Sequence, residues 1–172
     1  QICTALNVPL KIIRLSLKPA AGESIEAVAR QARYQALSEC LAAGEMLLTA
    51  HHQDDQAETF LLNALRGSGG AGLAAMPQIR ALGAGKLGRP LLAFSRAQLE
   101  NYAQQYQLQY VDDPSNAQLQ FDRNYLRHEI LPRLQERWPA TKQALSRAAS
   151  WQTEQQQVLE HLLAAQLPQF IG

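Results

Sequence analysis

Hydrophobic and polar positions follow two different periods in the first third of the chain. Residues 9–17 (PLKIIRLSL) alternate as in a strand, and residues 46–50 (MLLTA) form the short apolar run of a strand covered on both faces. Between them, apolar residues recur at helical spacing after Ser24, a candidate N-cap, and Gly44 is placed to end that helix. A further helix is predicted over residues 53–66. Strand, helix, strand and helix in this order predict an α/β fold with a right-handed crossover and a Rossmann-like parallel sheet.

The parallel sheet directs attention to two loops. In such sheets, ligands bind beyond the carboxyl ends of the strands. Here those ends are residues 18–22 and residues 51–55. We therefore expect a binding site to include these loops before any motif is considered.

The next part of the chain predicts a hairpin and a capped helix. Residues 79–82 and 89–94 flank a Gly-rich turn (GAGKLG) and fit a hairpin or two edge strands. Ser95 and Gln98 form a capping box for a helix that reaches about Tyr106.

The last part of the chain is mostly helical in pattern. Residues 108–111 fit a brief strand, and residues 112–116 (DDPSN) fit a turn. From Asp122 onward the pattern is helical, with interruptions at Pro132 and Pro139.

Composition narrows the class of protein without deciding it. The 172 residues are 47% hydrophobic, which suffices to bury a core and argues against disorder over most of the length. The net charge of +1 argues neither for nor against binding of nucleic acid. The basic side chains are unevenly distributed: residues 59–99 contain basic side chains and no acidic one, and residues 123–147 are also rich in basic side chains. Such zones fit a polyanion or a solvated helix face.

Cysteine usage and hydropathy indicate a compartment. Cys3 and Cys40 are too few for a disulfide framework or a zinc site, which indicates reducing conditions. No apolar run approaches the roughly 20 residues that span a bilayer. We therefore expect a reducing compartment and no membrane partner.

The most informative stretch is HHQDDQAET, residues 51–59. On a helix, His51, Asp54, Asp55 and Glu58 share one face. Carboxylates gathered on one face repel each other unless a magnesium ion, an ammonium group or a basic neighbour joins them. A charged first turn, favoured by the helix dipole, explains the two aspartates but not the doubled histidine or Glu58. A metal hydrolase is another interpretation, because His and Asp at these spacings can ligate metals.

A glycine-rich stretch follows the predicted helix. Arg66, Gly67, Ser68 and Gly69 resemble an anion loop, whose backbone N–H groups face phosphate. A flexible connector explains the glycines equally well.

Six sequence blocks occur in a fixed order: HHQDDQAET (51–59), RGSGGAGLAAM (66–76), RPLL (89–92), SRAQL (95–99), DPSN (113–116) and RNYLRHEILP (123–132). Together they resemble the tRNA(Ile)-lysidine synthetase family, within the PP-loop superfamily of N-type ATP pyrophosphatases. EAVARQARY (26–34) is also similar to a family segment. The resemblance extends from about Pro9 to Trp138, and the ordered set is far more specific than any one block.

The resemblance implies a fold and an activity. It implies the N-type ATP pyrophosphatase fold, incomplete in this chain, over residues 1–112, and a helical extension with a linker helix over residues 113–172. It further implies a bacterial cytoplasmic enzyme, an ATP-dependent ligase that modifies tRNA(Ile) bearing a CAU anticodon. ATP adenylylates the wobble cytidine at its C2 carbonyl oxygen, and free L-lysine then attacks C2 to form lysidine. ATP and Mg²⁺ are the implied cofactors. The resemblance leaves undecided whether the protein forms a homodimer.

The resemblance also implies catalytic roles for the first block. His51, His52, Asp54, Asp55 and Glu58 would form the catalytic set. Asp55 and Glu58 would bind lysine or magnesium, with Asp55 as the metal ligand. The two histidines would line the nucleotide, and a carboxylate or a histidine would accept a proton from the amine.

Other blocks would serve the nucleotide and the tRNA. Arg66 and the following residues 67–69 would hold phosphate or the anticodon nucleotide. Arg89, Asn124 and Arg127 would contact tRNA or order the site.

One departure from the family is evident in the sequence. The Ser-Gly-Gly-x-Asp-Ser loop that binds pyrophosphate in the family does not occur here. We therefore expect the chain to be an internal piece that is inactive by itself. Two alternatives stay open: a non-catalytic tRNA-binding module, and a metal-dependent phosphoesterase that would use His51, His52, Asp54 and Asp55.

Overall fold

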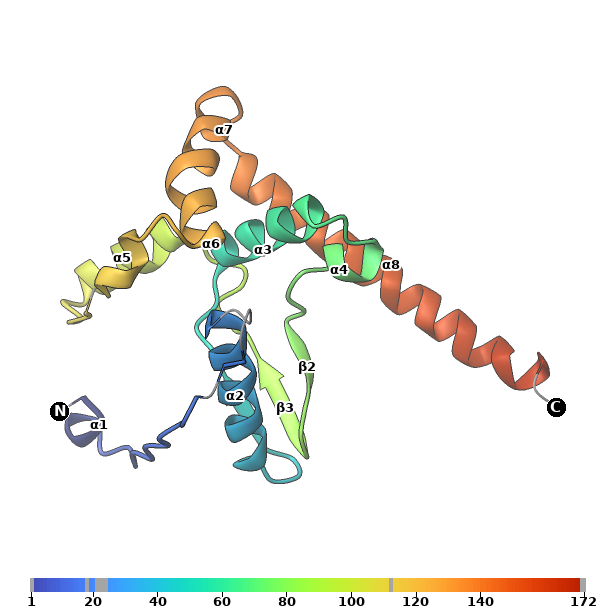
Figure 1. Ribbon diagram of the computed structural model, residues 1–172, viewed down its shortest axis with the longest axis horizontal. Coiled ribbons are helices and arrows are strands. Elements are labelled where there is room, and N and C mark those ends of the chain that lie inside the picture. Colours follow the sequence, from blue (N-terminus) through green and yellow to red (C-terminus); the bar gives the residue numbers. More distant parts are fainter. Residues whose placement is uncertain (1, 18, 21–24, 112, 171–172) are drawn as a thin grey trace. The chain divides into compact units, whose positions relative to one another are not determined.

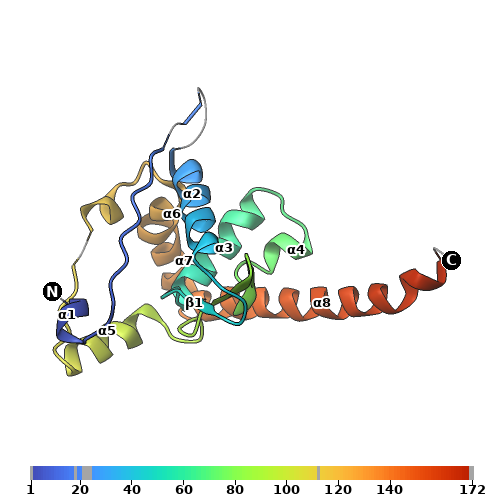
Figure 2. The same ribbon diagram turned by 90° about the horizontal axis from the view of Figure 1, so that it is seen from below.

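The computed structural model describes residues 2–17, 19–20, 25–111 and 113–170, and Figures 1 and 2 show its ribbon from two directions. The chain divides into two compact units. One comprises Gln1–Leu47 and Ala81–Leu87, and the other comprises Leu48–Arg80 and Gly88–Gly172. Each unit is described by itself.

The first unit holds most of a small sheet. Its elements, some of which end in the second unit, are α1 (Ile2–Ala5), α2 (Ile25–Glu39), β1 (Met46–Leu48), β2 (Ile79–Leu82) and β3 (Gly85–Gly88).

The sheet is mixed, with the strand order β1–β3–β2. Lys86 N–H donates to the carbonyl of Glu45, and Thr49 N–H donates to the carbonyl of Gly88, so β1 and β3 advance in the same direction. A tight turn joins β2 to β3, which makes that pair antiparallel. The predicted α/β class is confirmed, whereas the full Rossmann-like parallel sheet is not confirmed in the described part of the chain.

The prediction of a strand over residues 9–17 is wrong. The sheet of the described residues consists of β1, β3 and β2, and residues 9–17 lie outside it without regular structure. Their alternating apolar side chains, such as Leu10 and Ile12, are exposed. An alternating segment becomes a strand only where a neighbour accepts its backbone hydrogen bonds, and the pattern carries no information about that neighbour.

The prediction of a brief strand over residues 108–111 is also wrong, because these residues have no strand structure. The strand predicted over residues 46–50 is confirmed at residues 46–48, which form β1. Its expected cover on both faces is not confirmed, because Leu48 is 61% exposed.

The predicted hairpin is confirmed with a shifted second strand. β2 lies where expected, but β3 occupies part of the stretch predicted as a turn, and residues 89–94 form turns instead. Gly83 has a left-handed backbone (φ +57°) between the strands. A Cβ atom on Gly85 would lie 2.5 Å from the carbonyl oxygen of Glu45. These glycines therefore serve a tight turn and a close approach of two backbones.

The second unit is helical. Its elements are α3 (Gln53–Leu65), α4 (Gly70–Leu73), α5 (Arg96–Gln105), the 3₁₀ helix η1 (Pro114–Ala117), α6 (Asp122–Tyr125), the π-helix η2 (Leu126–Ile130), α7 (Leu131–Arg137) and α8 (Thr141–Phe170).

The first half of α8 supports the unit. α8 packs against α3, α4 and α7, and its later turns extend beyond them (Figures 1 and 2). Ala57 on α3 and Ala149 on α8 are both fully buried, and small side chains let neighbouring helices approach closely. The other buried apolar residues of the described part of this unit are Ala74, Met76, Leu126 and Leu131.

The helix predictions are largely confirmed. α3 matches the predicted helix, with Arg66 as its C-cap and a left-handed Gly67 (φ +74°) after it. Ser95 caps α5 through the predicted box with Gln98. α2 ends at Glu39, so Gly44 lies in the turn before β1 rather than at the end of a helix, and the predicted N-cap Ser24 lies outside the described residues.

The helical run from Asp122 is confirmed, and Pro132 changes its geometry. Proline has no N–H to donate to the carbonyl four residues earlier. The chain before it widens into a π turn, in which Leu131 N–H donates to the carbonyl of Leu126. Pro139 lies between α7 and α8, where the sequence predicted an interruption. The predicted boundary between residues 112 and 113 stays a prediction.

No helix within the described ranges is both long and apolar enough to cross a bilayer.

The approach of β3 to the segment before β1 predicts that Gly85→Ala destabilises the fold. The added Cβ would lie 2.5 Å from a backbone oxygen that cannot rotate away, so we expect a loss of about 1–3 kcal/mol in the free energy of unfolding. Thermal unfolding of the full-length protein measures the loss. Gly70→Ala is the control, because its Cβ meets the end of the flexible Gln152 side chain at 3.1 Å. Equal stability of the two variants would contradict the prediction.

Candidate active site

The two predicted histidines lie at the junction between β1 and α3. His52 is the N-cap of α3: its Nδ1 accepts a hydrogen bond from Asp55 N–H (3.4 Å), and Asp55 Oδ2 accepts from His52 N–H (3.0 Å). Nδ1 can accept only while it carries no proton, which places the ring proton of a neutral His52 on Nε2. His51 Nδ1 lies 2.9 Å from Thr49 Oγ1. Of the two adjacent histidines, His52 therefore caps α3, whereas His51 contacts Thr49, the residue after β1.

Glu58 is held by two arginines. Its side chain is 1% exposed, on the second turn of α3. Arg127 binds both carboxylate oxygens, with Nε–Oε1 at 2.7 Å and Nη2–Oε2 at 2.9 Å. Arg123 adds Nε–Oε2 at 2.7 Å. Bidentate arginine pairs are among the strongest hydrogen-bonded ion pairs, so Glu58 has a fully compensated charge despite its burial.

Asp55 shares the same arginines. Arg123 Nη2 lies 3.2 Å from Asp55 Oδ1 and also donates to the Asp55 carbonyl oxygen. The Asp55 side chain is 14% exposed, so it is the more accessible of the two acids. The hydrogen bond to Glu58, partly opposed by burial, raises the pKa of Arg127 above its ordinary value. The Arg127 guanidinium group therefore stays charged.

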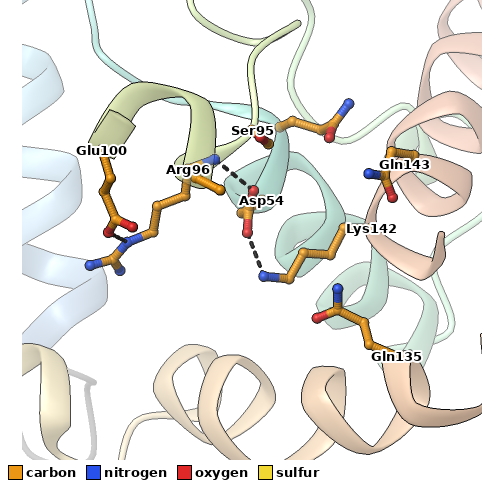
Figure 3. Close-up of a pocket in the computed structure, with 9 residues that line it drawn as sticks. Asp54, Ser95, Arg96, Glu100, Gln135, Lys142 and Gln143 are labelled. Atoms are coloured by element: carbon orange, nitrogen blue, oxygen red, sulfur yellow. Dashed lines mark hydrogen bonds and ion pairs between the residues drawn. The ribbon is translucent and has the colours of Figure 1, made fainter. Parts of the chain in front are cut away.

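Asp54 faces different partners. Its buried carboxylate accepts the backbone N–H of Arg96 through Oδ1 (3.0 Å) and the ammonium group of Lys142 through Oδ2 (Figure 3). Burial by itself raises the pKa of Asp54, but the Arg96 N–H and the Lys142 ammonium outweigh it, so the pKa lies below its ordinary value of 3.8.

A polar pocket of about 280 Å³ opens beside Asp54 (Figure 3). Its walls come from the first residues of α3, α5 and α8 and from one residue of α7. The lining residues are Gln53, Asp54, Ser95, Arg96, Ala97, Glu100, Gln135, Lys142 and Gln143.

These contacts form one set, which we call the α3 charge cluster. It consists of three acids, Asp54, Asp55 and Glu58, and three bases, Arg123, Arg127 and Lys142. Three negative and three positive charges leave the cluster neutral. The sequence left open whether a magnesium ion, an ammonium group or a basic neighbour would accompany these acids. In the structure, basic side chains accompany them.

The cluster does not fit a magnesium ion. Both oxygens of Glu58 and both oxygens of Asp55 already accept hydrogen bonds. Within the part of the chain that the structure describes, no three His, Cys, Asp or Glu residues group closely enough to hold a metal. A magnesium ion would need carboxylate oxygens that the arginines and the His52 N–H now occupy, so we assign no step of the chemistry to a metal held by Asp55.

The glycine-rich stretch is anchored to α3. Asn63 Nδ2 donates to the carbonyl of Gly72 (2.6 Å). The buried Gln56 amide makes a pair of hydrogen bonds with the backbone of Met76, at 3.1 and 3.0 Å. These contacts argue against a merely flexible connector. Arg66 at the start of the stretch is 64% exposed and pairs with Asp122 at 3.3 Å.

The other predicted phosphate-binding residues follow Arg66 along this stretch. Ser68 N–H donates to the carbonyl of Asn63, which continues the end of α3. Gly69 is the N-cap of the short helix α4. Together with the left-handed Gly67, these residues give the stretch a defined backbone path beside an exposed guanidinium group.

Two of the predicted tRNA-binding residues are buried. Arg89 Nη1 donates to the carbonyl of Pro77 (2.6 Å), and Asn124 Nδ2 donates to the carbonyl of Gln118 (2.9 Å). Of the two roles implied for them, tRNA contact or ordering of the site, burial favours ordering. Arg127 is engaged by Glu58, which favours the same interpretation.

Comparison with known proteins decides the family. Residues 1–134 match the PP-loop domain family. The chain belongs to this family.

Longer proteins resemble the chain over nearly all of its length. The chain is 52% identical over all 172 residues to the tRNA(Ile)-lysidine synthase of Yersinia pseudotuberculosis serotype O:1b, covering 38% of that protein. It is 49% identical over 167 residues, 97% of its length, to the protein of the same name from Coxiella burnetii, covering 37% of it. A third relative with that name, from Pseudomonas syringae pv. tomato, is 50% identical over 95% of the chain and 36% of the relative. The chain thus spans well under half of these relatives.

The sequence assigns no role to three residues that the structure places in or beside the cluster, Arg123, Lys142 and Gln56. Arg123 had a local signal, because it precedes Arg127 by one helical turn in the same block. Lys142 had none, because its partner Asp54 lies 88 residues earlier in the chain. Gln56 also had none, since its backbone partner follows a glycine-rich stretch.

The Glu58 contacts predict that Glu58→Gln destabilises the protein. The amide leaves two partly buried arginines with Asp55 as their remaining acid in the cluster, and loss of one member of a buried ion pair costs about 3 kcal/mol or more. Denaturant unfolding of the full-length protein measures the difference. Glu129→Gln is the matched control, because Glu129, whose side chain is 38% exposed, pairs at 3.8 Å with the exposed Arg133 and should contribute less than about 1 kcal/mol. Similar losses in both variants would contradict the buried-pair interpretation.

The lowered pKa of Asp54 predicts a pH dependence of stability. A carboxylate whose pKa is lower in the folded than in the unfolded state stabilises the fold at pH values above the unfolded pKa, and loses that contribution as pH falls through the folded pKa. The stability difference between the wild-type protein and Asp54→Asn should therefore be full at pH 7 and shrink below about pH 4. Unfolding free energies measured from pH 7 to pH 3 provide the test, and a difference that grows on acidification would contradict it.

Proposed function

We propose that the full-length protein is a tRNA(Ile)-lysidine synthase. It is an ATP-dependent ligase that joins L-lysine to C2 of the wobble cytidine of tRNA(Ile) with a CAU anticodon, in the cytoplasm. The observation that carries the proposal is the identity of 49–52% over nearly the whole chain to relatives of that name. The charge cluster at the start of α3 supplies the side chains that this chemistry needs.

The reaction has an activation step and a transfer step. The C2 carbonyl oxygen of cytidine is a poor leaving group, and adenylylation by ATP, with release of pyrophosphate, makes it a good one. The ε-amino group of lysine then bonds to C2, AMP leaves with the former carbonyl oxygen, and the amine gives up a proton. The protein must therefore hold a zwitterionic amino acid beside an activated nucleotide and accept one proton.

Asp55 and Arg123 offer both signs of charge to lysine. Among the acids of the cluster, Asp55 has the most exposed side chain (14%), and Arg123 beside it is 25% exposed. An ammonium group can be held by the carboxylate and a carboxylate group by the guanidinium group. We assign Asp55 to the binding of lysine, and Asp55 or a neighbouring histidine, His51 or His52, to acceptance of the proton.

Glu58 acts through its arginines in this proposal. With 1% of its side chain exposed and both oxygens engaged, it has no free lone pair directed to solvent. Its role is to orient Arg123 and Arg127, which makes it a positioning residue rather than a direct ligand of lysine.

Arg66 and the following loop are assigned to the phosphate side. The Arg66 guanidinium group is largely exposed beside a stretch with a defined backbone, which fits contact with a nucleotide or tRNA phosphate. ATP supplies the adenylyl group when it is bound. Gly67, Ser68 and Gly69 would approach the phosphate through their backbone.

The activity is tested on the full-length protein with a tRNA(Ile) transcript, ATP and radiolabelled lysine. We expect lysine incorporation that requires ATP and the wobble cytidine, with a transcript carrying uridine at that position as the control. Asp55→Asn should lower incorporation by roughly 100-fold, because it removes both an ammonium ligand and a proton acceptor. Glu129→Gln, on an exposed face of η2, should leave incorporation unchanged.

The outcomes separate the alternatives. Binding of tRNA without lysine incorporation would support a non-catalytic tRNA-binding module instead. Cleavage of a phosphodiester without ATP, sensitive to chelators, would support a phosphoesterase. Incorporation by Asp55→Asn at the wild-type rate would remove Asp55 from the site while leaving the activity in place.

A further inference from the structure

The beginnings of α3, α5 and α8 meet at one carboxylate. Asp54 is the second residue of α3, Arg96 is the first residue of α5, and Lys142 is the second residue of α8. The Asp54 oxygens accept the backbone N–H of Arg96 and the ammonium group of Lys142 (Figure 3). All these residues belong to one compact unit. A single buried side chain thus sets where these helices begin with respect to each other.

This arrangement has a clear electrostatic basis. The first turn of a helix carries a partial positive charge and N–H groups without partners in the helix. Several such ends brought together repel each other unless an anion lies between them. Asp54 supplies that anion from within the chain, and Lys142 then completes the compensation of its buried charge.

Lys142, whose ammonium group binds the Asp54 carboxylate, lies outside the segment that matches the PP-loop family. The family match ends at residue 134, and α8 begins at Thr141. Loss of the Lys142 ammonium group leaves the Asp54 carboxylate with one direct hydrogen-bond donor among the described residues. That donor is the neutral backbone N–H of Arg96 on α5. A buried carboxylate with so little compensation moves toward solvent or takes up a proton.

Asp54 and Asp55 are consecutive residues of the same turn. A shift or rotation of that turn which brings Asp54 toward water must also move Asp55, which is tied to it through one peptide bond. Asp55 also closes the capping box with His52. The geometry of the lysine-binding side of the cluster therefore depends on what happens at Asp54.

We propose that Lys142 is a positioning residue for the lysine-transfer step. Through Asp54 it holds the first turn of α3, and thereby Asp55, in the orientation that receives lysine. The inference rests on the proposed function, because it assigns Lys142 to the transfer half of that reaction. It predicts that the loss of Lys142 affects transfer much more than activation.

The test separates the two half-reactions in the full-length protein carrying Lys142→Met. Activation is followed as pyrophosphate released from ATP in the presence of tRNA(Ile) and the absence of lysine. Transfer is followed in a single turnover, by adding lysine to the preformed adenylylated tRNA complex. We expect transfer to slow by roughly 10- to 100-fold, the effect of an ångström-scale misplacement, while activation stays within about twofold of wild type.

Lys11→Met is the matched control, because it removes one lysine charge from the other compact unit. It should change neither half-reaction. A merely structural role for Lys142 would lower activation and transfer by the same factor, in proportion to the folded fraction, and that result would overturn the proposal. Wild-type rates of both steps in Lys142→Met would also overturn it.

A second variant keeps the test decisive if Lys142→Met does not fold. The pair Asp54→Asn and Lys142→Met, made together, removes the buried charge along with its partner and avoids an uncompensated carboxylate. It should fold and still show the selective loss of transfer. Wild-type transfer by this double variant would refute the positioning role.

Different experimental results would disprove the proposed function and the role of Lys142. If the wild-type protein releases no pyrophosphate and incorporates no lysine, the synthase assignment is wrong. If the wild-type protein completes both steps and Lys142→Met matches it, the synthase assignment stands and the role of Lys142 is withdrawn.

Discussion

The need to neutralise carboxylates on the first two turns of α3 organises the second unit of this protein. Asp54 and Glu58 are buried, and Asp55 is half-buried. Removing ionised carboxylates from water costs several kcal/mol each unless charged partners and hydrogen bonds replace the solvent. Those partners come from segments 65 to 88 residues later in the chain, on α6, η2 and α8. The ion pairs thus determine which later segments lie against α3 as much as the modest apolar core does.

Charge balance also shapes what the site can bind. The acids of the α3 charge cluster are already matched by arginines and a lysine, so an incoming cation meets no surplus of negative charge. A ligand with both signs of charge can be accommodated without leaving the cluster unbalanced, because it offers a replacement for each contact that it disturbs. This favours a zwitterionic amino acid over a bare divalent ion at Asp55, and it makes the orientation of the arginines as important as the acids themselves.

Local elements were predictable where a local signal specified them. The Ser95–Gln98 capping box at the start of α5 and the end of α3 at Arg66 depend on residues within one or two turns, and both were found as expected. Strands were predicted poorly, because a strand is completed by its neighbour. Residues 9–17 have the alternation of a strand and lie outside the described sheet, whereas Gly85 lies in a predicted turn and begins β3.

The sequence by itself determined the α/β class, the starts and ends of several helices, and the gathering of three acids at the start of one helix. Each of these depends on residues within about two helical turns of one another, whose spacing fixes their geometry. Only the tertiary structure decided which cations meet those acids, that Glu58 is inaccessible, and that Asp54 joins the starts of α3, α5 and α8. Such pairings depend on how distant segments pack, and the spacing of charges along a chain does not specify which opposite charge will lie nearest in space.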